Sequence, residues 1–184
     1  MGLERQDYTL AATATTDGQG MYIFDGLGAS DANCSVVFAQ EWNATYGVDE
    51  VASWAWLGPV TARGGASVTL PDLEVGLPNL GQFEPQAGAS VSSAGLSQQT
   101  PLTFEWTELS GEVAYWVDLA RGEELAVVWQ SPLVETPRVT WDGTLSDGSH
   151  VPPDTYWWGI GARRDLDGYE MTVYGYLTAL FITP

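Results

Sequence analysis

Apolar and polar residues alternate with a period of two along most of this chain, the pattern of strands that bury one face. One segment shows it clearly: Tyr115, Val117 and Leu119 fall on one face, while Trp116 and Asp118 fall on the other. Gly, Pro, Asn and Asp, which supply turn dihedrals, bound each alternating segment. No segment carries a convincing helical stripe. The pattern therefore predicts an all-β protein.

The predicted strands form two groups, separated by Gly76–Gly95, a stretch without strong periodicity. We place the domain boundary near residues 78–84, which gives two small β-sandwich modules, 1–78 and 79–184. The predicted strands of the first module are Tyr8–Thr16, Met21–Phe24, Cys34–Trp42, Val51–Leu57 and Ser67–Leu73. The second module is predicted as a seven-strand sandwich, with one strand near Ser90 and the others at Leu102–Trp106, Val113–Ala120, Leu125–Gln130, Arg138–Trp141, Thr155–Arg163 and Tyr169–Thr183.

The net charge excludes some classes of binding partner. The chain has 24 acidic residues, 6 arginines and no lysine, for a net charge of -18. A surface this acidic repels phosphate backbones and anionic lipids, so we expect neither a nucleic acid nor a membrane surface as partner. The absence of lysine removes P-loop and Schiff-base chemistry. No apolar run is long enough for a membrane span.

The segment from Thr15 to Leu27, TTDGQGMYIFDGL, resembles the T-D-x-x-G-x-Y-x-F-x-G-L core of carboxypeptidase regulatory-like and collagen-adhesin B-type repeats. Asp17 and Gly18 would form its turn, and Ser67–Leu73 is similar to the final strand of such a module. The resemblance covers about a third of the chain and implies a transthyretin-like sandwich on a bacterial surface.

Such modules have one or two strands before this turn, whereas only Tyr8–Thr16 is predicted here. A sandwich short of a strand leaves a groove of unpaired backbone groups, which a strand from another chain fills. Head-to-tail filling of this kind builds a fibre. The alternative is a module that is complete with fewer strands.

The second module is similar to fibronectin type III-like domains, through Leu102–Trp106 and Thr155–Gly159. Within it, Trp141–Gly143 and Val151–Tyr156 resemble the W-D-G…G…V-P-x-G-x-Y pattern of Ig-like modules of the flagellar hook-capping type. Asp154 stands where that pattern has Gly, a minor departure because Asp also accepts tight turns. Both resemblances imply extracellular or cell-surface modules that are not enzymes.

The residue types for nucleophilic or zinc catalysis are scarce. His150 is the only histidine and lies in a predicted loop, so we interpret it as a surface histidine. Cys34 opens an apolar strand, which favours a buried thiol. Zinc would need several His or Cys ligands. No cofactor and no catalytic residue is predicted.

Calcium is the one metal for which the sequence offers candidates. Asp165 and Asp167 precede Gly168, which places two carboxylates in one turn. Calcium takes six to eight oxygen ligands, and no complete EF-hand pattern accompanies the pair. A turn-forming role for these residues is the favoured interpretation.

The nine tryptophans exceed what two small cores can bury, so some must face solvent. Trp54, Trp56, Trp116 and Trp157 are the candidate ligand or interface residues. Three functions follow. The first is an extracellular structural or adhesive protein that forms surface filaments by strand addition between copies or binds a surface protein. The second is a carbohydrate-binding module that uses exposed tryptophans, and the third is an accessory domain of a secreted enzyme.

Overall fold

The computed structural model describes residues 2–5, 10–15, 17–19, 21–24, 33–39, 54–61, 67–71, 84–109, 111, 113–166, 168–175 and 177–184. Their regular structure is almost entirely β, with a single short 3-10 helix, η2 (Ser93–Gly95). The all-β prediction is confirmed. None of the described residues lies in a helix long and apolar enough to cross a membrane. The strands are β1 (Gly2–Arg5), β2 (Leu10–Thr13), β3 (Asn33–Ala39), β4 (Trp54–Thr61), β5 (Ala89–Ser92), β6 (Leu102–Glu105), β7 (Ala114–Arg121), β8 (Ala126–Gln130), β9 (Arg138–Trp141), β10 (Asp154–Leu166), β11 (Tyr169–Tyr174) and β12 (Thr178–Thr183).

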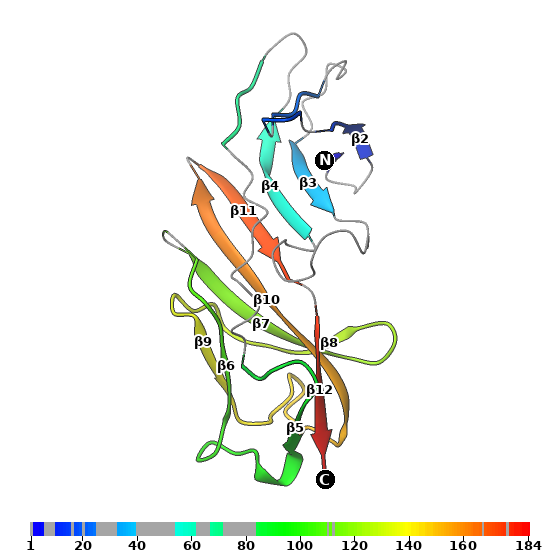
Figure 1. The fold of residues 1–184 in the computed structure, drawn as a ribbon, viewed down its shortest axis with the longest axis vertical. Helices are drawn as coiled ribbons and strands as arrows, with labels where there is room; N and C mark the ends of the chain where they lie inside the picture. The colour runs from blue at the N-terminus through cyan, green and yellow to red at the C-terminus, as the bar shows by residue number, and fades with distance from the viewer. Residues whose placement is uncertain are drawn as a thin grey trace.

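Ten of these strands form one sheet in which β10 is the central element (Figure 1). The sheet order is β2-β1-β3-β4-β11-β10-β12-β5, and β7 and β8 branch from β10. Strand β10 is 13 residues long, so two strands share one of its edges: β12 pairs with its first half and β11 with its second. Strand β7 pairs along the other edge. Every pairing in this sheet is antiparallel except that of β5 with β12.

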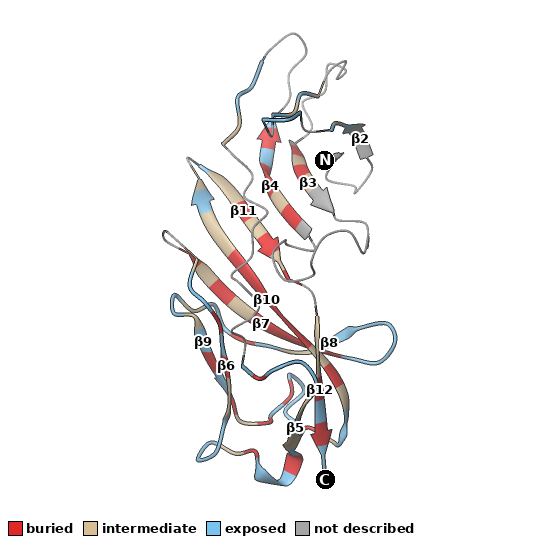
Figure 2. Ribbon diagram, in the orientation of Figure 1, coloured by how far each residue is buried: buried red, intermediate tan, exposed pale blue. Residues whose placement is uncertain are grey.

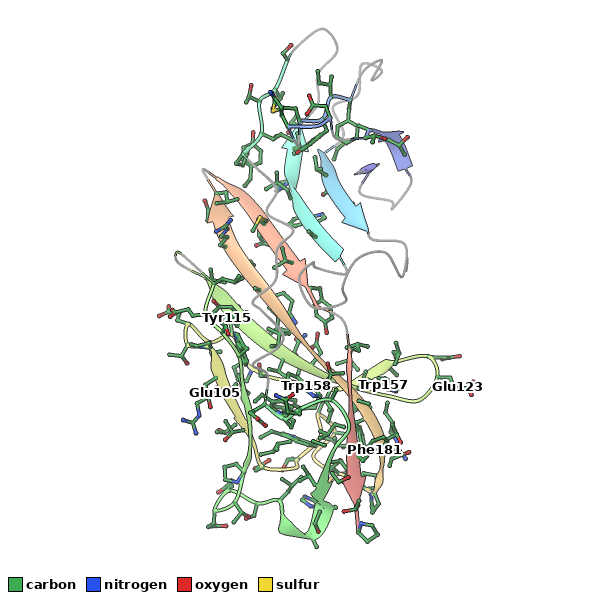
Figure 3. The ribbon with its side chains drawn as sticks, viewed as in Figure 1. Glu105, Tyr115, Glu123, Trp157, Trp158 and Phe181 are labelled. Carbon is green, nitrogen blue, oxygen red and sulfur yellow. The ribbon has the colours of Figure 1, made fainter. Side chains whose placement is uncertain are left out.

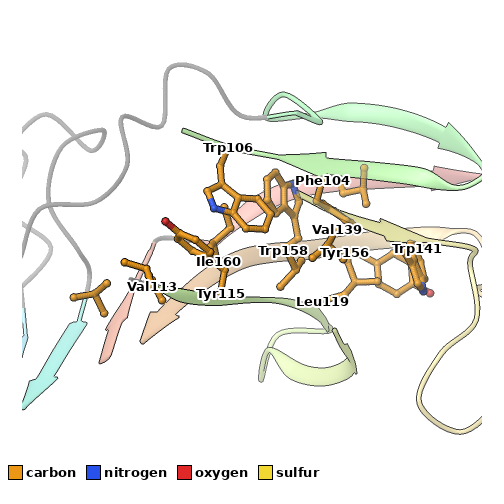
Figure 4. Close-up of a cluster of buried hydrophobic side chains, with 14 of the residues drawn as sticks. Phe104, Trp106, Val113, Tyr115, Leu119, Val139, Trp141, Tyr156, Trp158 and Ile160 are labelled. Carbon is orange, nitrogen blue, oxygen red and sulfur yellow. The ribbon is translucent and has the colours of Figure 1, made fainter. Parts of the chain in front are cut away.

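The two-stranded sheet of β6 and β9 covers one face of β7 and β10, which gives a sandwich-like arrangement (Figure 4). Aromatic side chains fill the space between the layers. The ring centroids of Phe104 and Trp158 are 5.0 Å apart, and those of Trp106 and Tyr115 are 5.4 Å apart. Such aromatic pairs contribute about 0.5–1.5 kcal/mol each beyond the burial of their area. Figure 2 shows the buried positions concentrated along β7 and β10.

The amino-terminal strands extend the same sheet. Strand β4 pairs with β11 over five residues, from Gly58 opposite Glu170 to Trp54 opposite Tyr174. The buried hydrophobic side chains of β3 and β4, including Val36 and Leu57, belong to one cluster with those of the carboxyl-terminal half. Strands from before and after residues 78–84 are thus joined by a hydrogen-bonded ladder. The boundary itself stays a prediction.

Several strand predictions need correction. Residues 21–24 and 67–71 lie outside every strand of the described structure, although Met21–Phe24 and Ser67–Leu73 alternate like strands. Strand β1, which precedes β2, was not predicted because Leu3 is its only large apolar residue. Two strands, β1 and β2, therefore precede the turn at Asp17-Gly18, where the sequence predicted one. The predicted strand Tyr169–Thr183 is two strands, β11 and β12, with buried Gly175 between them. Both have neighbours on each side, so neither is a sheet edge.

The loop after β9 is built by its Asp-Gly turns, as the sequence predicts. The Asp142 carboxylate accepts the Thr144 backbone N–H at 2.9 Å, and Gly143 has φ of +87°. A Cβ on Gly143 would lie 2.7 Å from the His150 ring, so the loop needs glycine for space as well as for its backbone angle. The Trp141 indole N–H donates to the Thr144 carbonyl at 2.7 Å. These bonds pin the loop against the core.

Candidate functional site

The face of the large sheet opposite the core carries three of the four predicted tryptophan candidates. Residues directly opposite each other in antiparallel strands project from the same face. Trp116 on β7 lies opposite Gly161 on β10, which lies opposite Tyr174 on β11. Trp157 lies four residues before Gly161 on the same strand, and Trp56 on β4 lies opposite Thr172 of β11. We call Trp56, Trp116, Trp157 and Tyr174 the outer aromatic face; all four are half-buried.

Two neighbouring tryptophans on β10 project from opposite faces of the sheet. Trp158 is 1% exposed and packs in the core, whereas Trp157 leaves the strand on the other side (Figure 3). This is the alternation that the sequence predicts for a strand with one buried face. The fourth candidate, Trp54, lies opposite Tyr174 in the register, and its side chain falls outside the described residues.

Two glycines in β10 shape this face. A Cβ on Gly161 would overlap the ring of Trp116, coming within 2.5 Å of Cη2. A Cβ on Gly159 would lie 2.9 Å from Leu177 Cδ2 and 3.5 Å from Tyr174 Cε1. The rings therefore lie directly against the backbone of β10, in space that only glycine leaves open. This arrangement covers the central strand and reduces the exposure of Trp116.

A buried carboxylate lies beside these rings. Asp118 on β7 is 6% exposed and accepts three hydrogen bonds from neutral donors. Its Oδ2 accepts the Tyr174 hydroxyl at 2.6 Å and the Trp116 indole N–H at 3.0 Å. Its Oδ1 accepts the Gln130 amide at 2.7 Å. Burial, and secondly the hydrogen bond to Asp118, raise the pKa of Tyr174 far above its ordinary value, which keeps the hydroxyl protonated as a donor.

This geometry fits contact better than proton transfer. Both oxygens of Asp118 already accept strong hydrogen bonds, and the carboxylate is shielded from solvent. The half-exposed indoles offer flat apolar surface for a sugar ring or another protein. Asp118, Gln130 and Tyr174 were missed by sequence reasoning. The only sequence signal was an acidic residue, Asp118, two positions after Trp116 in the middle of a predicted strand.

Of the two candidate calcium ligands, the structure describes Asp165, which lies in a turn. Asp165 Oδ1 accepts the backbone N–H of Gly168 at 2.9 Å, which is the turn-forming role that the sequence favours. Asp167 lies outside the described residues. In the part of the chain that the structure covers, no three His, Cys, Asp or Glu side chains gather as a metal site.

His150 and Cys34 occupy ordinary structural positions. His150 is exposed, and its Nε2 lies 2.9 Å from the carbonyl oxygen of Ser93, across the loop that follows β9. Cys34 is 4% exposed within β3, so the prediction of a buried thiol is confirmed.

A cavity of about 670 Å³ lies near the turn between β10 and β11. Arg163 and Arg164 line it together with Glu135, Asp165 and Glu170. The Arg163 guanidinium is 3.5 Å from the Glu170 carboxylate, and both side chains are more than 40% exposed. The lining carries more negative than positive side chains, so it does not form an anion site.

Comparison of the chain with protein-family models, with curated proteins and with solved structures finds no match. The resemblances to adhesin-type repeats and to Ig-like modules therefore stay predictions.

Proposed function

We propose that this chain is a non-catalytic structural or adhesive protein of the cell exterior, and that copies of it assemble by strand addition. The observation that carries the proposal is the single large sheet, which extends along the molecule and whose main strand order begins and ends in an uncharged edge strand. These two edge strands are β2, with the sequence LAAT, and β5, with the sequence ASVS; β8, at the end of the branch through β7, forms a third edge.

The edge strands support the proposal of assembly, because proteins that avoid edge-to-edge association protect their edge strands. Native edge strands are commonly blunted by charged side chains, proline, bulges or a very short length. Strands β2 and β5 have only four residues each, but neither contains a charge or a proline. In a chain with net charge -18, edges without carboxylates are where two copies can approach with least repulsion.

The shape supports a structural role. Strands β1 to β4 lie toward one end of the long axis, and β5, with the end of β12, lies at the other (Figure 1). Strand β10 connects them, because it pairs with β12 through Asp154–Trp158 and with β11 through Gly161–Leu166. Contacts at opposite ends of an elongated unit suit a chain of subunits.

The test is the state of assembly of the native protein at low micromolar concentration, measured by light scattering and negative-stain electron microscopy. Filaments or large polymers are the expected result. A monodisperse monomer under these conditions, at both low and high salt, would contradict the proposal.

The outer aromatic face favours carbohydrate binding as a second candidate. Trp56, Trp116 and Trp157 project from one face of the sheet, and indoles in such positions stack on sugar rings. Isothermal titration calorimetry against soluble polysaccharides tests it, with Trp157→Ala as the variant. If binding occurs, it should weaken in the variant; equal binding by both proteins would exclude this face as the site.

A further inference from the structure

Trp157 differs from Trp116, its neighbour on the outer aromatic face, in having no protein partner. The Trp116 indole N–H donates to Asp118, and the ring packs against Tyr174 with centroids 6.2 Å apart. Within the described residues, Trp157 makes no such ring contact, and its indole N–H neither donates to a protein group nor is buried. The half-buried Trp157 therefore keeps part of an apolar ring and a hydrogen-bond donor available for another molecule.

Small residues flank Trp157 on both neighbouring strands. Ala120 of β7 lies opposite Trp157 on one side, and Ala179 of β12 lies opposite it on the other. An alanine side chain is too short to cover an indole, so neither hides the ring from solvent. Phe181 lies two residues after Ala179, opposite Thr155, and is 40% exposed. Such diagonal neighbours are about 7–8 Å apart, so Trp157 and Phe181 offer adjacent apolar surfaces (Figure 3).

Gln130 adds an exposed polar group to this part of the face. It lies opposite Asp118, and its amide donates to the Asp118 carboxylate at 2.7 Å. A carboxylate only accepts hydrogen bonds, so the amide nitrogen of Gln130 faces Asp118 and the carbonyl oxygen remains an acceptor for a ligand. Asp118 is itself buried and held by Trp116 and Tyr174, which fixes the orientation of Gln130.

The charges around Trp157 favour a neutral ligand. The carboxylate of Asp154 is bound to Arg121 at 2.6 Å, and Asp118 is buried with three hydrogen bonds, so neither is open to a cation. The exposed Glu123, in the turn between β7 and β8, and the net charge of -18 repel acidic polymers. A molecule without charge meets neither obstacle.

We propose that Trp157, Phe181 and Gln130 bind a neutral β-linked glucan, with successive sugar rings stacked on the two aromatic side chains. The proposal deepens the second candidate function and rests on it. A glucose ring with all its hydroxyls equatorial has an apolar C–H face, which stacks on an aromatic ring. The hydroxyls at its rim exchange hydrogen bonds with the Trp157 indole N–H and the Gln130 carbonyl oxygen.

Titration calorimetry with cellohexaose and laminarihexaose, two neutral β-glucan oligosaccharides, tests this site. The parent protein should bind at least one of them. The Kd should rise about tenfold in Trp157→Ala, which loses the stacking surface. In Gln130→Ala, which loses one hydrogen bond at an exposed position, it should rise about two- to tenfold. Circular dichroism checks that each variant is folded.

Trp56→Ala is the matched control. Trp56 is also a half-buried tryptophan of the outer aromatic face, but it lies on β4, which β11 separates from β10. The control should bind like the parent protein. An equal loss of affinity in Trp56→Ala and Trp157→Ala would spread the site over the whole face; the inference would then fail while the second candidate function stands.

Salt and ligand charge give an independent measurement. Binding of a neutral glucan should keep the same Kd between about 0.1 M and about 1 M salt, although the Debye length falls from about 10 Å to about 3 Å. Hexagalacturonate, an acidic oligosaccharide, should bind more weakly than either glucan. Tighter binding of hexagalacturonate would overturn the inference.

The remaining outcomes separate the inference from the function on which it rests. If neither glucan binds but another soluble polysaccharide does, the inference fails and the second candidate function stands. If no polysaccharide binds, both fail. If Trp157→Ala leaves glucan binding unchanged and instead lowers the assembly mass in light scattering, Trp157 belongs to a contact between copies, and the inference is wrong.

Discussion

Substituting Gly161 by alanine should destabilise the protein because of one neighbouring side chain. Gly161 lies in the middle of β10, where glycine normally weakens a strand. Replacing glycine by alanine at a compatible position stabilises a protein by about 0.4–1 kcal/mol, since the unfolded chain loses freedom. Here the added methyl would overlap the ring of Trp116, coming within 2.5 Å of Cη2. The sign of the effect therefore depends on Trp116.

The magnitude follows from these opposing terms. Forcing a methyl group into a filled site costs about 1–3 kcal/mol. After subtracting the unfolded-state gain, we expect the free energy of unfolding of Gly161→Ala to fall by about 1–2 kcal/mol. Displacing Trp116 also strains its hydrogen bond to Asp118, which favours the upper part of this range.

A double-mutant cycle measured by urea denaturation isolates this interaction. In a Trp116→Ala background, Gly161→Ala should be neutral or stabilising by up to about 1 kcal/mol. Gly95→Ala serves as the control, because its nearest neighbour would be Ser92 Cβ at an ordinary 3.8 Å. An equal loss of stability from Gly161→Ala in both backgrounds would refute the reasoning.

Three further predictions concern single polar groups. Tyr174→Phe removes a donor from the buried carboxylate of Asp118 and should lower the free energy of unfolding by about 1.5–3 kcal/mol in urea titrations; an unchanged midpoint would contradict the buried network. Arg121→Ala breaks an ion pair with Asp154 whose two side chains are each 42% exposed, so calorimetry should find the melting temperature nearly unchanged. Hydrogen bonds from Ser149 lower the pKa of Asp147. The contribution of Asp147 to the free energy of unfolding is therefore present above the ordinary Asp pKa of about 4 and is lost as pH falls through the folded-state pKa. The difference in stability between the parent protein and Asp147→Asn should shrink below about pH 4, and a constant difference would exclude this linkage.

The alternation of apolar and polar residues predicted strands best where one face of the strand packs on the core. Strand β9 has the predicted bounds, and β10 begins and ends within three residues of its prediction. Met21–Phe24 alternates equally well but forms no ladder within the described structure. Alternation reports that an extended segment has one buried face. It does not report whether a partner strand, which comes from distant sequence, is present to bond with it.

The break between β11 and β12 coincides with a change in which alternate residues are buried. Buried positions are Met171 and Val173 before Gly175, and Leu180 and Ile182 after it, so the buried face switches from odd to even residues. The outer site was harder to predict. Asp118 lies on the face that the sequence assigns to solvent, and it is buried because Tyr174, 56 residues away, lies across it. The local sequence around Asp118 does not indicate which distant residue will cover it.

The ladder between β4 and β11 leads us to expect that the two parts of the chain stay together after the connection between them is cut. Its five residue pairs, with the shared hydrophobic cluster beneath them, join the halves independently of the peptide bonds near residues 78–84. A protease that cuts there would yield two bands under denaturing conditions and one particle under native ones. Separately expressed fragments should likewise recombine, each supplying the strand that the other's exposed edge lacks.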